Sequence, residues 1–144
     1  MTGVEFHFNA PDKMAYACRL LRKAVAKGAK VVVTGEPGFL RELDRTLWTF
    51  EPLEFIPHCY ADLSPAAVRD ASPVVLADSA RTAPHHEVLV NLGGAVPEGF
   101  ERYERLIEVV AADEDDRALG RQRWKHYANR GYSVERKDLN LSLG

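Results

Sequence analysis

The sequence predicts one α/β domain over residues 1–144, a three-layer αβα sandwich around a mainly parallel central sheet. Short apolar runs typical of buried strands alternate along the chain with longer amphipathic segments typical of helices. The length of 144 residues suits one compact domain. A composition of 46% hydrophobic and 28% charged residues is that of an ordinary globular protein. Antiparallel strands at the edges of the sheet remain an open alternative.

The first predicted elements are a strand, a helix and a second strand. Residues 4–9 alternate apolar and polar side chains, which indicates a strand. Apolar residues then recur at helical spacing, in a segment that Asn9 or Asp12 can cap and that Gly28 ends. The valines at 31–33 form a β-branched run, which favours a strand buried on both faces.

The middle of the chain adds a helix, a long loop and two strands. A glycine-rich turn leads into a helix from about Phe39 to Trp48. Residues 52–73 are rich in proline and small side chains, and we expect them to be mostly loop. Apolar runs at 74–77 and 88–92 predict two strands that are separated by a polar connection.

The last third of the chain ends in a strand and a long helix. Residues 100–105 form a predicted short helix, and the apolar run at 106–110 predicts a strand. Four acids at 113–116 favour the first turn of a helix, because the helix dipole stabilises negative charge there. This helix should extend to about Arg130 and stop at Gly131. The alternation resembles that of nucleotide-binding folds, which by itself assigns no function.

Charge is unevenly distributed along the chain, although the net charge is only −2. Residues 1–116 carry 12 Lys and Arg against 19 Asp and Glu, whereas residues 117–144 carry 7 against 2. This asymmetry indicates either a contact surface for an anionic partner or a basic helix that balances an acidic body. The chain has two cysteines, no signal-peptide pattern and no apolar run near the ~18 residues of a membrane span. These features favour a protein of the reducing cytoplasm.

Patterns for catalysis and metal binding are weak. The segment at 34–38 lacks the lysine of a P-loop and the spaced glycines of a dinucleotide site. Cys59 is adjacent to His58, but neighbouring residues of an extended segment point to opposite sides. Cys18 falls on the apolar stripe of a helix, and residues 85–87 have no second cluster to complete a zinc site. We therefore predict no enzymatic activity, no metal and no cofactor.

One face of the final predicted helix combines cations with an aromatic ring. Five residues share this face: Arg117, Arg121, Trp124, Lys125 and Ala128. At about 100° per residue they fall within an arc of about 100°, whereas Leu119 and Tyr127 point toward the core. Cations that flank an indole can bind carboxylates and also offer an apolar contact. The alternative is a solvated basic face with Trp124 half-buried against the body of the protein.

A second unusual stretch, residues 47–58, places three large aromatic side chains and two prolines after a predicted helix. Aromatic side chains in a rigid loop suit a protein interface. They equally suit a small core beneath a long loop.

These two stretches carry a resemblance to a known family. The earlier stretch has Leu43, Leu47 and Trp48 at the end of a helix, followed by Phe55 to His58. The closing helix has Leu119, Arg121, Arg123, Trp124, Lys125 and Tyr127. In the order and spacing of these residues, nearly the whole chain resembles the chi subunit of bacterial DNA polymerase III, an accessory protein of the clamp-loader complex.

The resemblance implies a non-catalytic connector with two partners. One partner is the C-terminal tail of the single-stranded-DNA-binding protein, which is acidic and ends in Pro-Phe with a free carboxylate. The implied tail-binding residues are Arg121, Trp124, Lys125 and, as a weaker match, Arg117. The other partner is the psi subunit of the clamp loader. The implied residues of this heterodimer interface are Trp48, Phe55 and Pro57.

Further expectations accompany the resemblance. Some relatives bind a repair helicase at the surface that faces psi, and contact with DNA would be indirect. The family position of Trp124 is commonly tyrosine, so an aromatic ring is kept without the hydroxyl. From the residues alone, direct binding of single-stranded nucleic acid by the basic helix is the alternative, with Trp124 stacked on a base.

Overall fold

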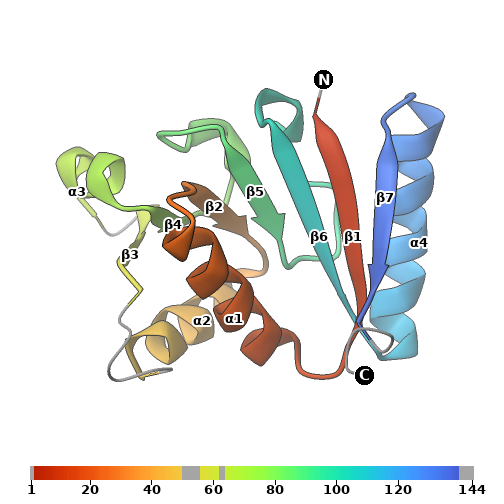
Figure 1. Ribbon diagram of the computed structural model, residues 1–144, viewed down its shortest axis with the longest axis horizontal. Helices are drawn as coiled ribbons and strands as arrows, with labels where there is room; N and C mark the ends of the chain where they lie inside the picture. The colour runs from red at the N-terminus through yellow and green to blue at the C-terminus, as the bar shows by residue number, and fades with distance from the viewer. Residues whose placement is uncertain (1, 50–55, 62–63, 140–144) are drawn as a thin grey trace.

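A parallel sheet of seven strands forms the centre of the protein (Figure 1). In the computed structural model, which describes residues 2–49, 56–61 and 64–139, the strand order is β3-β4-β2-β5-β6-β1-β7. The strands are β1 Gly3–Ala10, β2 Val31–Thr34, β3 His58–Tyr60, β4 Val74–Leu76, β5 Val88–Asn91, β6 Arg105–Ala111 and β7 Val134–Asp138. The helices are α1 Lys13–Ala26, α2 Pro37–Thr49, α3 Ala66–Ala71 and α4 Glu114–Asn129, with 3-10 turns η2 Ala80–Thr82 and η3 Phe100–Arg102.

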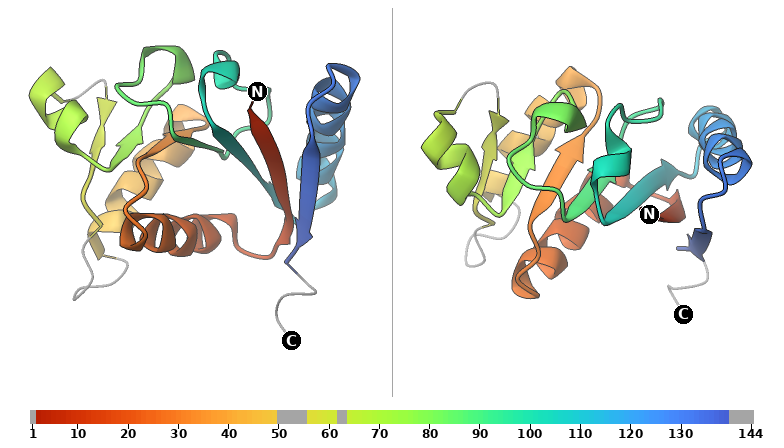
Figure 2. Two further views of the ribbon diagram at one scale, coloured as in Figure 1. Left: turned by 45° about the horizontal axis from the view of Figure 1, so that its top comes forward. Right: turned by 90° about the horizontal axis from the view of Figure 1, so that it is seen from above.

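Helices cover both faces of the sheet, which confirms the predicted three-layer sandwich. α1 and α2 pack on one face, and α4 packs on the other together with η2 and η3. The chain moves toward the β3 edge through α1 and α2, and it returns toward the β7 edge through the later connections. When crossovers are right-handed, a connection that moves one way across the sheet lies on one face, and a connection that moves back lies on the other face. The last crossover therefore places α4 against β1, β6 and β7, far from α3 (Figure 2).

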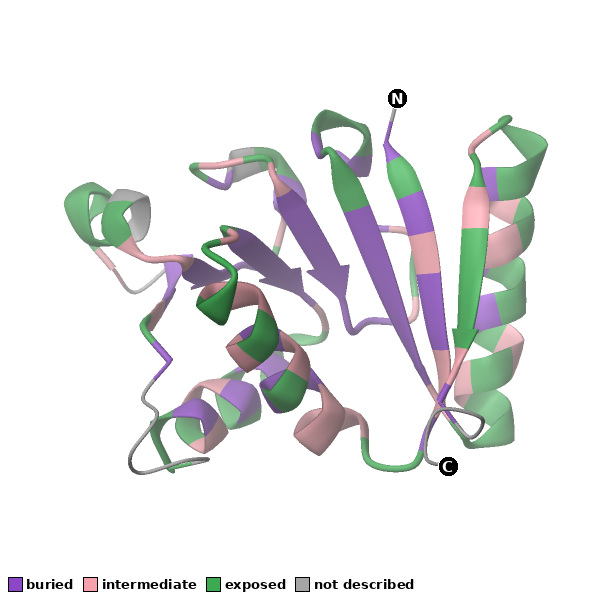
Figure 3. Cartoon of the chain, in the orientation of Figure 1, coloured by how far each residue is buried: buried purple, intermediate pink, exposed green. Residues whose placement is uncertain are grey.

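The hydrophobic core is divided by the sheet into two clusters. Val31 and Val33 of β2 pack with α1 and α2, whereas Val32 packs with the opposite layer. The prediction that these valines are buried on both faces is confirmed. The central strands are almost entirely buried, and β7 at the edge is largely exposed (Figure 3).

The ends of the two helices beside β1 follow the predicted signals. Asp12 caps α1, since its Oδ1 accepts a hydrogen bond from the amide of Ala15 at 3.0 Å. Asp113 caps α4 in the same way, and the chain leaves α4 through Gly131 with a φ of 82°. A φ in this range favours glycine, which explains why the helix stops there. Within the described ranges, no helix has the length and apolarity needed to cross a membrane.

Two predictions about the fold are wrong in part, and the open alternative of antiparallel edges does not hold for the described residues. Both edge strands are parallel to their neighbours, so the sheet has no antiparallel edge among the described residues. The predicted loop at 52–73 contains β3 and α3, which are only three and six residues long. The predicted helix at 100–105 is the three-residue turn η3. β7 was not predicted, because its sequence Val-Glu-Arg-Lys-Asp has the charges of an edge strand and little apolar alternation.

Candidate functional site

A pocket of about 340 Å³ lies between α4 and the β7 end of the sheet. Its apolar lining comes from β1, β6 and α4: Phe6, Phe8, Val110, Gly120 and Trp124. Its charged lining is entirely cationic among the described residues: Arg117, Arg121, Lys125 and Arg136. Four of the five residues that the sequence placed on this helix face, all except Ala128, therefore line one pocket. The pocket also includes Phe6, Phe8 and Arg136, three residues of β1 and β7 that the sequence did not indicate.

α4 approaches the sheet closely because its inward face carries a glycine. Gly120 is buried, and a Cβ at this position would lie 3.0 Å from Cγ2 of Val110 on β6. A larger residue would push the helix away from the strand. Arg123 and Tyr127 continue the buried face toward the C-terminal end of α4. The pocket thus has a shallow floor of strand side chains beneath the basic face.

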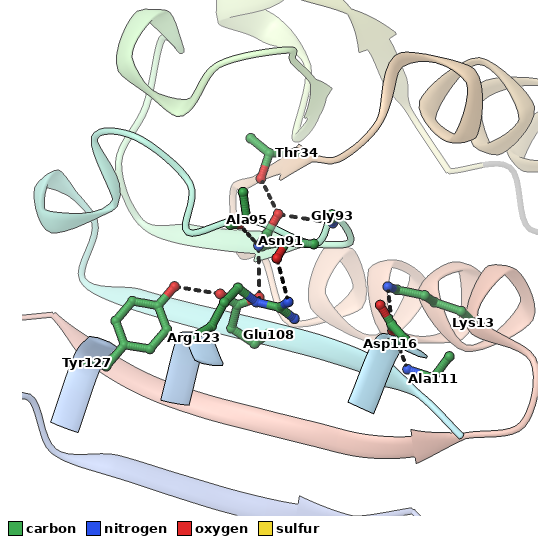
Figure 4. Close-up of polar contacts among 11 residues, drawn as sticks. Lys13, Thr34, Asn91, Gly93, Ala95, Glu108, Ala111, Asp116, Arg123 and Tyr127 are labelled. Carbon is green, nitrogen blue, oxygen red and sulfur yellow. Dashed lines mark hydrogen bonds and ion pairs between the residues drawn. The ribbon is translucent and has the colours of Figure 1, made fainter. Parts of the chain in front are cut away.

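A buried polar cluster fixes the rotation of α4 about its axis (Figure 4). Glu108 of β6 is fully buried, and Arg123 Nε lies 3.0 Å from its Oε1. Asn91 Nδ2 donates to the same oxygen at 2.8 Å, and the Tyr127 hydroxyl donates to Oε2. Burial raises the pKa of Glu108, and the Arg123 guanidinium opposes that shift. Arg123 also donates to the Gly94 carbonyl at 3.0 Å, which ties α4 to the loop after β5.

A second contact fixes the first turn of α4. Asp116 Oδ2 accepts hydrogen bonds from the Ala111 amide at 2.7 Å and from Lys13 Nζ at 3.0 Å (Figure 4). The carboxylate therefore links α4 to the end of β6 and to the start of α1. These contacts hold the backbone of α4 at both ends and so set which of its residues face the pocket.

Trp124 is half-buried and forms one wall of the pocket. Its ring centroid lies 5.1 Å from that of Phe6, and the two planes are tilted by 50°. The sequence also placed Leu119 and Tyr127 toward the core. Tyr127 is fully buried, but Leu119 is 41% exposed. Leu119 lies over the loop after β5, where a Cβ on Gly94 would come within 2.9 Å of the leucine Cδ1.

The cations of the pocket differ in their existing partners. Glu114 Oε1 lies 2.7 Å from Arg121 Nη2, and Glu114 Oε2 lies 4.0 Å from Arg117 Nη1. The Arg121 hydrogen bond holds the pKa of Glu114 below its usual value. Among the described residues, neither Lys125 nor Arg136 forms an ion pair with a carboxylate.

The residues implied at the psi interface lie at the opposite edge of the sheet. Trp48 at the end of α2 is 60% exposed. Its ring centroid lies 5.2 Å from that of His58, whose Nε2 is 3.1 Å from Asp44 Oδ1. Pro57 is exposed beside them, and Phe55 lies outside the described residues. The structure thus brings Trp48 next to the start of β3.

The family model for the DNA polymerase III chi subunit, HolC, matches residues 1–135. The chain belongs to this family of replication accessory subunits. It is 29% identical to the DNA polymerase III subunit chi of Pseudomonas aeruginosa, over 94% of this chain and 95% of the relative. It is 26% identical to the DNA polymerase III subunit chi of Haemophilus influenzae, over 85% of each chain.

The thiols of this chi family member lie in the core. Cys18 is fully buried on α1, and burial raises the pKa of its thiol to about 11. Cys59 is buried on the α4 side of the sheet, whereas the neighbouring His58 directs its Nε2 to Asp44. A thiolate nucleophile needs a lowered pKa or a base within hydrogen-bond reach. These surroundings favour a packing role for both cysteines.

Proposed function

We propose that this protein is a non-catalytic adaptor of the replisome. It binds the acidic C-terminal tail of the single-stranded-DNA-binding protein in the pocket beside α4. Through a psi subunit, bound near Trp48, it links that tail to the clamp loader of DNA polymerase III. Membership of the chi family supports a replication role, and the resemblance noted in the sequence supplies these two partners.

One observation carries the proposal for the tail. The pocket has an apolar floor, and every charged residue in its described lining is a cation. A peptide that ends in Pro-Phe would place its aromatic ring on the floor beside Trp124 and its carboxylates on the rim. Charge-assisted hydrogen bonds from guanidinium groups to carboxylates are about twice as strong as neutral ones. The pocket therefore combines the two contacts that such a tail requires.

The positions of the two surfaces support a connector. The pocket adjoins β7, and Trp48 packs near β3, so the sites lie at opposite edges of the sheet. They also use helices from opposite layers, α4 and α2. Separate surfaces allow both partners to be held at once. Several tails on one DNA-bound oligomer would raise the effective concentration for rebinding, so each contact can be weak.

A titration with three ligands tests the proposal. A labelled acidic peptide that ends in Pro-Phe, a single-stranded oligonucleotide of equal charge and a nucleoside triphosphate are each added to the full chain. We expect saturable binding of the peptide that weakens as salt rises. Binding of the oligonucleotide in preference to the peptide would instead support direct recognition of nucleic acid, with Trp124 stacked on a base.

A further inference from the structure

One cation of the pocket belongs to β7, and its guanidinium lies over an aromatic ring of β1. Arg136 lines the pocket, and its Cζ lies 5.3 Å from the centroid of the Phe8 ring on β1. A guanidinium held over an aromatic face loses less freedom when it binds a ligand than a free side chain would. Its planar fork matches the geometry of a carboxylate.

Strand alternation directs this arginine, and not its neighbours, into the pocket. Arg136 is in register with Phe6, which packs against Trp124. Glu135 and Lys137 are in register with Glu5 and His7, on the other face of the sheet. Successive side chains of a strand point to opposite faces. β7 therefore presents one cation to the pocket and its second cation to the opposite layer.

The distribution of existing ion pairs distinguishes the two ends of the pocket. Arg117 and Arg121, toward the N-terminal end of α4, share Glu114. Lys125 and Arg136 have no carboxylate partner among the residues that the structure describes. A ligand carboxylate that binds Lys125 and Arg136 therefore displaces no ion pair of the protein. A ligand's terminal residue carries its carboxylate close to its apolar side chain. The most favourable site for that carboxylate is therefore between Lys125 and Arg136.

We infer that Arg136 is a binding residue of this pocket, and that it holds the terminal carboxylate of the tail together with Lys125. The inference rests on the proposed function. It gives the bound tail a direction: the terminal residue lies at the Lys125 end of α4, and acidic side chains farther upstream lie at Arg121 and Arg117. A volume of about 340 Å³ is at the lower end of the ~300–1,000 Å³ of ligand pockets. One aromatic side chain and its carboxylate suit that size.

Calorimetric titration with two peptides tests the inference. Both have the same acidic sequence ending in Pro-Phe, one with a free terminal carboxylate and one with a terminal amide. We expect the unaltered protein to prefer the free acid by roughly 10-fold or more, as for hydrogen bonds to a charged group. Arg136→Met should weaken binding of the acid by roughly 10-fold, change binding of the amide little and so remove most of the preference.

Two further variants control for folding and for net charge. Lys137→Met removes the same charge from the same strand on the other face, and it should keep the preference for the acid. Arg136→Lys keeps the charge without the fork, and it should show an intermediate preference. If Arg136→Met keeps the full preference for the free acid, the inference is overturned and the proposed function stands. If neither peptide binds the unaltered protein, the proposed function fails and the inference with it.

Discussion

Arg121 Nη2 lies 2.7 Å from Glu114 Oε1, two helical turns earlier on α4. Both side chains are exposed, and the carboxylate is also 4.0 Å from Arg117. Glu114 therefore occupies the position that an acidic side chain of the proposed tail would take. In the proposed complex, binding of the tail would exchange an internal ion pair for an intermolecular one, which would limit the gain from each arginine.

Replacing this internal competitor should strengthen binding of the tail. Glu114→Gln removes the charge and leaves the length of the side chain, so we expect the dissociation constant of the acidic peptide to fall a few-fold. Asp115→Asn is the matched control, because it removes one acid from the same turn on a face away from the pocket. Fluorescence anisotropy of a labelled peptide measures both. An equal gain in the two variants would indicate an effect of net charge alone.

Removing the arginine itself should have the opposite effect. We expect Arg121→Ala to weaken peptide binding by at least about 10-fold, the scale of a hydrogen bond between charged groups. Arg130→Ala serves as the control, since Arg130 is exposed beyond the end of α4 and donates to the His126 carbonyl. Unchanged affinity in Arg121→Ala, with an unaltered circular dichroism spectrum, would place the tail site elsewhere.

The two proposed interfaces should be energetically independent. Trp48→Ala removes an indole that is 60% exposed, and we expect it to abolish capture of a psi-type subunit in a pull-down assay. Its affinity for the tail peptide should stay within the ~0.3–0.5 kcal/mol expected for distant sites. Arg121→Ala should show the reverse pattern. A peptide dissociation constant that rises with the concentration of the partner subunit would contradict the connector.

Stability should depend strongly on the buried pair below the helix. Arg123 and Glu108 are 2% and 0% exposed, so Arg123→Met leaves a buried carboxylate without its cation. We expect the free energy of unfolding in urea to fall by about 3–5 kcal/mol. The double variant Glu108→Gln, Arg123→Met should lose less, because the neutral amide leaves no unpaired charge, its oxygen can still accept from Asn91, and its NH2 can donate to the Tyr127 hydroxyl. An equal loss in both variants would show that the charge of Glu108 is not the cause.

Acid should destabilise the fold through its histidines. His7 is buried on β1, with Tyr16 Oη 2.6 Å from Nδ1 and Glu5 Oε2 3.0 Å from Nε2. Burial lowers its pKa below the usual 6.5, and the nearby Lys137 and Arg105 lower it further, against the opposing effect of Glu5. The unfolded chain therefore binds a proton more readily than the folded one. The free energy of unfolding should fall as the pH drops below about 6.5.

Urea unfolding at several values between pH 7.5 and pH 5.5 measures this slope. Burial also lowers the pKa of His85 and His126, so these residues contribute in the same direction. His7→Gln should reduce the slope and not remove it. A slope that is identical in His7→Gln and the unaltered protein would assign the acid sensitivity to the other two histidines.

Local patterns predicted most elements and the basic face of α4. Helical geometry alone grouped Arg117, Arg121, Trp124 and Lys125, because a surface on one helix depends on spacing within a single element. The prediction that the valines at 31–33 are buried rests on local sequence in the same way. Glu108 also has a local signal, because a lone acid within the apolar run at 106–110 requires a buried partner.

The strand side of the pocket depends on contacts between distant parts of the chain. Arg136 belongs to a strand only because residues 134–138 pair with β1, and its charged sequence looks like that of a loop. The alternation at 4–9 did place Phe6 and Phe8 on one face, but nothing local showed that α4 would cover them. Similarly, β3 is too short to be distinguished from its proline-containing surroundings.

β1 lies between β6 and β7, so the strand that comes first in the sheet's sequence order is flanked by two strands that come about 100 or more residues later. Its apolar side chains stay uncovered until almost the whole chain has been synthesised, and pairing over such a sequence separation is slow. A chain that ends before residue 134 lacks both the outer neighbour of β1 and one wall of the pocket. The pocket is therefore complete only once residues 134–138 have paired with β1.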